Sequence, residues 1–238
     1  MTLPPLAYAF LAGLANVLGA AAVTSRARWS MRALDTMVAL SAGFMIAVSV
    51  GELLPEAIER SGRTAALAAL AGYLLVHLTQ HTFARHFHFG EETHEVTASV
   101  SASALVGLLL HTFFDGVAIA SGYAVSPSLG FLVFVAILLH KLPEGLAISS
   151  LFLAAGAGRR AALSAAAALG LATIAGVLLT EYVGGLRDFG LAISAGVTLY
   201  VAASNLVPEF QSKLGWRMPV SFFAGCALYF AARAVAGV

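Results

Sequence analysis

The sequence has little charge and almost no cysteine. Only 11% of its 238 residues are Asp, Glu, Lys or Arg, and Cys226 is its single cysteine. One cysteine cannot form an intramolecular disulfide, and in an apolar run we expect it to be a small packing residue. The 13 Lys and Arg nearly balance the 12 Asp and Glu, so the chain lacks the basic surface that nucleic acid requires. We therefore expect no nucleic-acid partner.

What the sequence has instead is long apolar runs. Hydrophobic residues make up 60% of the chain and its mean hydropathy is +0.89, far above the values of an ordinary soluble domain. Runs of about twenty apolar residues can cross the hydrocarbon core of a lipid bilayer. The expected spans are about 5–24, 36–55, 65–84, 100–122, 129–152, 161–181, 189–208 and 219–236. We predict an all-α integral membrane protein with eight transmembrane helices, forming one domain over residues 1–238.

The orientation is predicted from the Lys and Arg residues of the loops, which gather on the cytosolic side of membranes. With the N-terminus outside, eight of them lie in inward loops and four in outward regions. The inward set is Arg26, Arg28, Arg32, Arg85, Arg159, Arg160, Lys213 and Arg217. We therefore expect both termini outside. The first stretch lacks the features of a cleaved secretory signal, and compact loops without a targeting extension favour a prokaryotic plasma (inner) membrane.

An internal repeat favours a transporter. The elements Ser41-Ala-Gly43 and Glu52-Leu-Leu-Pro55-Glu56 of the second span return in the seventh as Ser194-Ala-Gly196 and Asn205-Leu-Val-Pro208-Glu209, with a constant offset of 153 residues. An even-numbered and an odd-numbered span cross the membrane in opposite directions, so the repeat would be inverted. Inverted repeats are common in secondary transporters, which bind their substrates near mid-membrane.

Two histidine and carboxylate pairs stand in the fourth and fifth spans, which lie between the repeat halves. The fourth reads His111-Thr-Phe-Phe-Asp115-Gly, and the fifth reads His140-Lys141-Leu-Pro-Glu144-Gly. Each acid follows its histidine by four residues, so both side chains share one face of a helix. A charged side chain at mid-span costs roughly 2.5 to 3.5 kcal/mol on insertion scales. The two acids and Lys141 therefore indicate pairing, water or a bound cation inside the bundle.

Two imidazoles and two carboxylates form a suitable ligand set for Zn²⁺, and also for Fe²⁺, Mn²⁺ or Co²⁺. Three other interpretations remain open at this point: ion pairs that fix helix packing, an intramembrane zinc-dependent hydrolase, and a metal sensor that transports nothing. A hydrolase needs an open coordination position for water, and no His-Glu-x-x-His motif is present. We predict a transporter rather than an enzyme, with the metal as substrate and no cofactor.

The paired motifs resemble those of the ZIP (Zrt- and Irt-like) family of divalent metal transporters. The fourth-span motif is similar to that family's His-Asn-x-x-(Asp/Glu)-Gly and the fifth-span motif to its His-x-x-Pro-Glu-Gly. The Ser-Ala-Gly and Leu-Pro-Glu elements are similar too, so the resemblance covers nearly the full length. It implies eight spans in a 3+2+3 arrangement, N-out and C-out, often as a homodimer in the bilayer. It also implies transport of Zn²⁺ and related ions such as Cd²⁺ toward the cytosol, with four metal ligands: His111, Asp115, His140 and Glu144.

Some members of that family hold a second metal ion. They use an Asn after the fourth-span His, a polar or acidic residue after the fifth-span His, and a Glu in the sixth span. This sequence has Thr112, Lys141 and Thr173 at the corresponding positions. We predict that the Lys141 ammonium occupies roughly the place of the second cation, so that the site is mononuclear, and that without metal Lys141 pairs with Asp115 or Glu144.

Histidines and acids also gather near the ends of the spans. Five of the seven histidines stand at the end of the third span and in the loop 85–98, which we expect in the cytosol. Imidazoles there would hand ions on, although a solvated polar loop would have the same composition. The expected exit or loop contacts are His77, His81, His86, His88, His94 and Glu209. Glu52 and Glu56, toward the outer end of the second span, would attract cations at the entrance or serve as solvated or capping residues.

Overall fold

The computed structural model is helical in nearly all of the residues that it describes, which are 5–25, 31–82, 98–211 and 213–236. The elements are α1 (Pro5–Thr24), α2 (Met31–Val48), η1 (Ser49–Leu53), α3 (Leu54–Ser61), α4 (Arg63–Thr82), α5 (Ala98–Val125), α6 (Pro127–Ala154), α7 (Arg159–Tyr182), α8 (Gly184–Tyr200), η2 (Val201–Leu206), α9 (Val207–Gln211) and α10 (Arg217–Ala236). The elements η1 and η2 are π-helical. Since α2, η1 and α3 run on without a break, as do α8, η2 and α9, the elements form eight long helical stretches.

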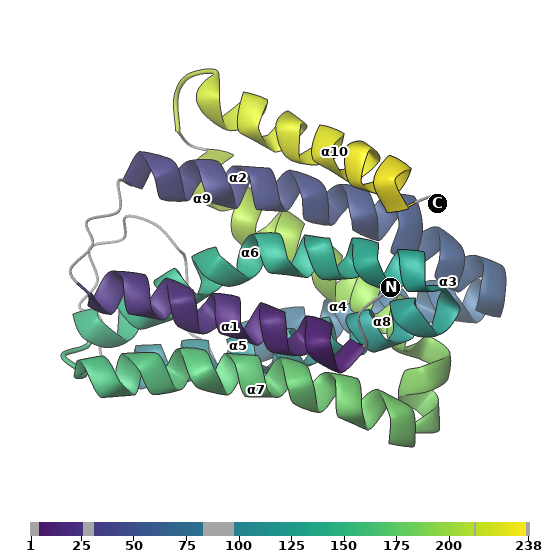
Figure 1. Cartoon of the computed structure of the whole chain (residues 1–238), viewed down its shortest axis with the longest axis horizontal. Coiled ribbons are helices and arrows are strands. Elements are labelled where there is room, and N and C mark those ends of the chain that lie inside the picture. Colours follow the sequence, from purple (N-terminus) through teal and green to yellow (C-terminus); the bar gives the residue numbers. More distant parts are fainter. Residues whose placement is uncertain (1–4, 26–30, 83–97, 212, 237–238) are drawn as a thin grey trace.

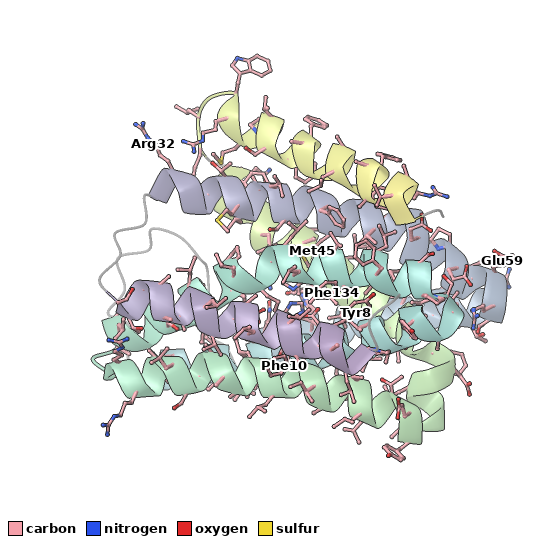
Figure 2. All side chains as sticks on the ribbon, viewed as in Figure 1. Tyr8, Phe10, Arg32, Met45, Glu59 and Phe134 are labelled. Atoms are coloured by element: carbon pink, nitrogen blue, oxygen red, sulfur yellow. The ribbon has the colours of Figure 1, made fainter. Side chains whose placement is uncertain are left out.

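These stretches are long enough to cross a membrane. Seven of them are also apolar enough by composition, and the eighth, α4, has 20 residues, which span about 30 Å at 1.5 Å per residue. Arg32 and Glu59 lie at opposite ends of the bundle, whereas Phe10, 61% exposed, lies on its side (Figure 2). Charge at both ends and apolar side chains between them are what a bilayer requires.

The helices form two groups that meet at the centre of the bundle. In one group, α1 and α5 each pack against both α6 and α7. In the other, α2 packs against α10, and α4 packs against α8. Contacts of α5 with α8 and of α2 with α6 join the groups. Along the chain, three helical stretches precede α5 and α6 and three follow them, which is the predicted 3+2+3 order. The start of α1 and the end of α10 lie at the same end of the bundle (Figure 1), which we call the N-terminal end.

The inverted repeat is visible in the packing of the second group. Gly43 of α2 lies against the backbone of Phe222 in α10, and Gly196 of α8 lies against the backbone of Ala69 in α4. The two glycines stand 153 residues apart in the sequence, and so do their two partner residues. The π-helical segments η1 and η2 follow these glycines in the two halves. The predicted inverted repeat is therefore a feature of the fold.

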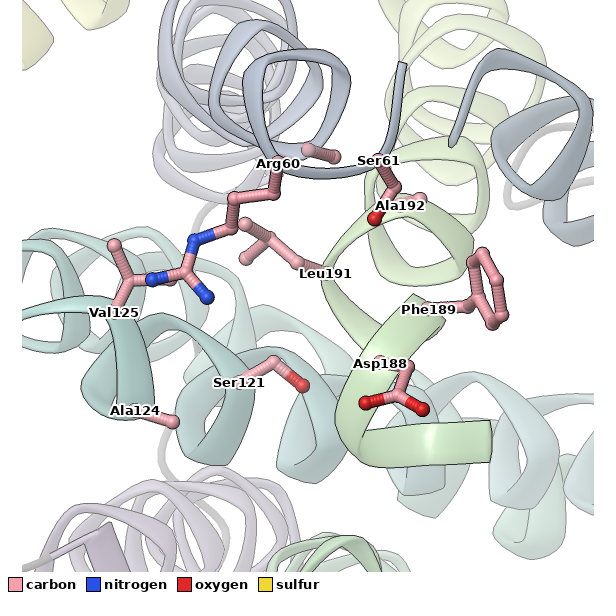
Figure 3. A pocket seen from close by; sticks show the side chains of 10 residues that line it. Arg60, Ser61, Ser121, Ala124, Val125, Asp188, Phe189, Leu191 and Ala192 are labelled. Carbon is pink, nitrogen blue, oxygen red and sulfur yellow. The ribbon is translucent and has the colours of Figure 1, made fainter. Parts of the chain in front are cut away.

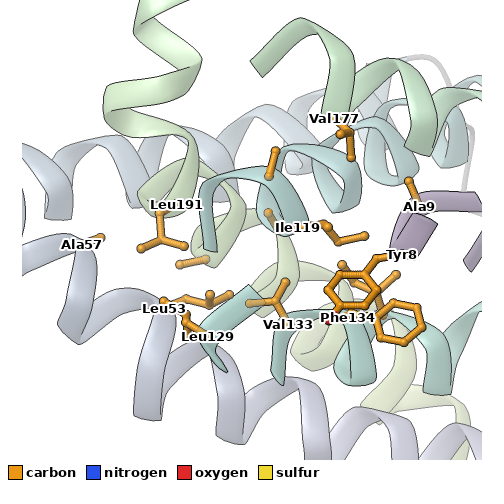
Figure 4. Close-up of a cluster of buried hydrophobic side chains, with 14 of the residues drawn as sticks. Tyr8, Ala9, Leu53, Ala57, Ile119, Leu129, Val133, Phe134, Val177 and Leu191 are labelled. Atoms are coloured by element: carbon orange, nitrogen blue, oxygen red, sulfur yellow. The ribbon is translucent and has the colours of Figure 1, made fainter. Parts of the chain in front are cut away.

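An apolar cluster joins the two groups toward the N-terminal end. Tyr8 of α1 stacks on Phe134 of α6 with ring centroids 4.5 Å apart, and Leu191 of α8 belongs to the same cluster (Figure 4). Ile119, another member, follows Asp115 by one turn of α5. Apolar side chains therefore lie between the central acids and this end of the bundle.

Pro143 creates a hydrogen-bonding site on α6. Proline has no N–H, so the carbonyl of Leu139, four residues earlier, loses its helical partner. The hydroxyl of Ser41 in α2 donates to that carbonyl at 2.9 Å. Its repeat counterpart in α8, Ser194, donates to the carbonyl of Phe114 in α5 at 3.1 Å. The two Ser-Ala-Gly elements therefore connect the second helix group to the two helices that carry the histidines and acids.

Candidate metal site

The four side chains expected as ligands come together between α5 and α6. His111, Asp115, His140 and Glu144 each offer one donor atom, and these atoms all lie within 4.8 Å of one another. All four residues are buried. Asp115 Oδ2 lies between the imidazoles, 3.5 Å from His111 Nε2 and 3.3 Å from His140 Nε2. Two nitrogen and two oxygen donors brought together in this way can bind Zn²⁺ or a similar divalent ion.

The His140 ring is oriented by its own helix. Its Nδ1 donates a hydrogen bond to the Ala136 carbonyl at 3.0 Å, since a carbonyl oxygen can only accept. In a neutral imidazole the other nitrogen, Nε2, then carries a lone pair, and this nitrogen faces Asp115 Oδ2. Metal-binding histidines are commonly fixed in this manner. Two facing lone pairs repel unless a proton or a cation lies between them, so the orientation suits a bound cation.

Lys141 lies in the same cluster. Its side chain is fully buried, and its Nζ is 2.6 Å from Asp115 Oδ2 and 2.7 Å from Glu144 Oε2. The pairing predicted for Lys141 is therefore present, with both acids rather than one. Glu144 Oε1 has no hydrogen-bond partner among the described residues, so that oxygen is available to a further ligand.

Glycines allow neighbouring helices to approach the site closely. At Gly145 of α6, a Cβ would overlap the backbone oxygen of Asn16 in α1, and at Gly116 of α5, a Cβ would overlap the backbone oxygen of Thr173 in α7. Each of these glycines directly follows one of the clustered acids. The absence of a side chain thus brings α1 and α7 against the site from two sides, as small residues do in membrane bundles.

Thr112 and Thr173 are fully buried. With Lys141, they are the positions at which this sequence is expected to lack the ligands of a second metal ion. The Thr112 hydroxyl donates to the Leu109 carbonyl at 3.1 Å, and the Thr173 hydroxyl donates to the Leu169 carbonyl at 3.3 Å. Each threonine therefore uses its one hydroxyl proton within its own helix. Lys141 instead directs its ammonium toward the acids of the cluster.

Glu52 and Glu56, the acids expected near an entrance, both pair with arginines. Glu52 Oε1 accepts a hydrogen bond from the Tyr229 hydroxyl and forms an ion pair with Arg233 Nε, each at 2.9 Å. Glu56 Oε1 pairs with Arg60 Nε at 2.9 Å. The first pairing ties η1 to α10, and the second lies within α3. An entrance role for either acid stays a prediction.

A cavity of about 500 Å³ lies beside Arg60, where α3 and α5 end and α8 begins. Its lining includes the polar side chains of Ser121 and Asp188 (Figure 3). The Ser121 hydroxyl is buried and has no hydrogen-bond partner among the described residues. Ser121 follows Asp115 by six residues, or about 9 Å along α5. The cavity therefore lies on the N-terminal side of the four donors.

The expected exit contacts are described only in part. His77 is an exposed residue of α4 whose ring meets that of Tyr200 edge-on, with centroids 5.8 Å apart. The side chains of His81 and Glu209 lie outside the described part of the chain, as does the loop with its three histidines, His86, His88 and His94. Their role as exit or loop contacts stays a prediction.

Asn16 of α1 is a polar residue near the site that the motif spacing does not single out. It is fully buried, and neither polar atom of its amide has a hydrogen-bond partner within the described ranges. Its backbone meets Gly145, the residue after Glu144. An unpaired buried amide costs roughly 1–3 kcal/mol. In the sequence, Asn16 could have been noticed as a single amide side chain in an otherwise apolar span.

Comparison with known families links this geometry to a function. The family model described as ZIP zinc transporter matches residues 81–232, which is more than half of the chain. The matched range contains all four donors and Lys141, and it extends from the end of α4 into α10. A search of curated proteins finds no match.

Proposed function

The chain belongs to the ZIP zinc transporter family, and from that membership we propose that it carries Zn²⁺ toward the cytosol through His111, Asp115, His140 and Glu144. Members of this family are transporters and not enzymes, so the hydrolase alternative is excluded and the metal ion is the substrate. Fe²⁺, Mn²⁺, Co²⁺ and Cd²⁺ are further proposed substrates. Mixed nitrogen and oxygen donors support this range of ions, since they suit several divalent transition metals.

The convergence of four buried donors within 4.8 Å carries this proposal. Ionisable groups are costly inside a membrane, and they mark the pathways of substrates and ions. Apolar side chains, among them Ile119, separate the donors from the N-terminal end. We propose that the two helix groups rock against each other and part this apolar cluster, so that the site faces one side of the membrane at a time.

The proposed route enters at the cavity beside Arg60 and leaves at the opposite end of the bundle. Asp188 supplies a carboxylate at the cavity. Arg60, which also lines the cavity, pairs with Glu56. On the other side His77, the histidine-rich loop and Glu209 would receive the ion. The distribution of Lys and Arg supports a cytosolic location for this second side.

The loop charges support an N-out and C-out orientation. The start of α1 and the end of α10 lie at the same end of the bundle (Figure 1), as this orientation requires. We assign residues 1–238 to a single transporter domain, and we place it in a prokaryotic plasma membrane. The family resemblance supports a homodimer as the assembly.

Uptake of radiolabelled Zn²⁺ into proteoliposomes that carry the purified protein tests the proposed function. We expect saturable uptake above that of protein-free liposomes, with competition by unlabelled Fe²⁺, Mn²⁺ and Cd²⁺ that ranks the substrates. Tight binding of Zn²⁺ without uptake would contradict transport and would favour a sensor.

Purified protein is expected to bind close to one Zn²⁺ per protomer. The Lys141 ammonium, which pairs with Asp115 and Glu144, stays tethered beside the four donors when an ion binds, and its positive charge disfavours a second divalent ion near the first. Equilibrium dialysis in detergent followed by elemental analysis measures the ratio, with His140→Ala as the background control. A ratio near two would contradict a mononuclear site.

A further inference from the structure

Lys141 holds the two carboxylates that the proposed ion would bind. Its Nζ lies 2.6 Å from Asp115 Oδ2 and 2.7 Å from Glu144 Oε2, and the side chain is fully buried. Asp115 Oδ2 is also the oxygen that faces both imidazoles, at 3.5 Å and 3.3 Å. Asp115 Oδ2 is therefore both a donor atom of the proposed metal site and a partner of the Lys141 ammonium.

A metal ion and the ammonium compete for these oxygens. A divalent ion binds carboxylate oxygens at about 2.0–2.2 Å, which would bring it within a few ångströms of Lys141 Nζ. Two positive charges at that separation in a buried site repel strongly. The ammonium stands on a flexible four-carbon stem, whereas the ligands stand on two packed helices. Binding of the ion therefore displaces the ammonium, and release of the ion lets it return.

Release of the ion would otherwise leave two buried carboxylates without a counter-charge. Uncompensated charge is costly inside a membrane, and this cost would slow the step in which the empty transporter turns back to the side of loading. We propose that Lys141 is a tethered counter-cation, which replaces the departed ion on Asp115 and Glu144 and so permits the return of the empty transporter. This inference rests on the proposed function. With the ammonium in place, the acids and Lys141 together carry one net negative charge instead of two.

A purely structural ion pair, which would only fix the acids in their places, makes a different prediction. A transporter that cannot return empty still exchanges ions across the membrane, because its loaded form moves in both directions. Loss of a structural pair would impair the loaded and the empty forms alike. Net uptake and exchange therefore separate the two roles of Lys141.

The test compares Lys141→Met with the wild-type protein in proteoliposomes. One assay follows net uptake of radiolabelled Zn²⁺ into liposomes free of Zn²⁺, and the other follows exchange of the label against unlabelled Zn²⁺ inside. We expect net uptake to fall about 100-fold while exchange stays within about twofold of wild type. Zn²⁺ should also bind more tightly, because its internal competitor is gone. Lys141→Arg, which keeps the charge, should retain part of the net uptake.

Lys141→Gln provides a second variant if Lys141→Met does not fold. Its amide can still donate a hydrogen bond to one carboxylate but carries no charge, so we expect the same separation of uptake from exchange. Equal loss of both activities, or unchanged net uptake, would overturn the role of Lys141. Failure of the wild-type protein in both assays would instead overturn the proposed transport function.

Discussion

Zn²⁺ uptake by the His140→Ala variant is expected to fall more than about 100-fold below wild type, since losing even an outer partner of a metal ligand commonly costs about 10–100-fold. The variant loses the imidazole whose Nε2 faces Asp115 Oδ2 at 3.3 Å and whose orientation is fixed by the Ala136 carbonyl. It leaves the contacts of Lys141 with the two acids in place. The effect should therefore reflect metal binding rather than a newly unpaired charge.

Leu138→Ala is the matched control for this variant. Leu138 stands two residues before His140 on α6, and its side chain is 37% exposed, so its truncation should leave uptake near wild type. The measurement is the initial rate of radiolabelled Zn²⁺ uptake, together with the dissociation constant for Zn²⁺ in detergent. Saturable uptake by His140→Ala at the wild-type rate would show that the ion takes another route.

The four donors could be predicted from the sequence because their arrangement depends on local geometry. A spacing of four residues places a histidine and an acid on one face of a helix wherever that helix packs. The two helices are also neighbours, because α5 ends at Val125 and α6 begins at Pro127, which leaves no room for a distant connection. Helical spacing and a short turn were therefore enough to bring His111, Asp115, His140 and Glu144 together.

Contacts between distant helices could not be predicted in this way. The approach of Asn16 to Gly145 depends on which helices become neighbours, which apolar composition alone does not determine. Loss of a helical bond at Leu139 follows from Pro143, but Ser41 as its new partner is known only from the packed bundle. The pairing of Lys141 with both acids likewise required the packed geometry.

The Gly145→Ala variant is expected to lose thermal stability and to bind Zn²⁺ more weakly. The new Cβ would overlap the backbone oxygen of Asn16, and no change of side-chain rotamer can relieve a contact with backbone. Overpacking typically costs about 1–3 kcal/mol, which corresponds to a fall in melting temperature of roughly 2–12 °C for a chain of this length. Because Gly145 directly follows Glu144, moving α1 away from α6 would also disturb a carboxylate of the proposed site.

Gly107→Ala on α5 is the control for this prediction. A Cβ there would have room, since its nearest neighbour is Gln80 Cγ at 3.9 Å, and alanine favours the helix more than glycine does. The measurement is thermal unfolding in detergent, with and without Zn²⁺. We therefore expect a lower melting temperature than wild type for Gly145→Ala but not for Gly107→Ala. Equal melting temperatures for the two variants would mean that α1 does not press against α6 at Asn16. A lower melting temperature with wild-type Zn²⁺ affinity would mean that the close approach of α1 stabilises the bundle without shaping the ligand cluster.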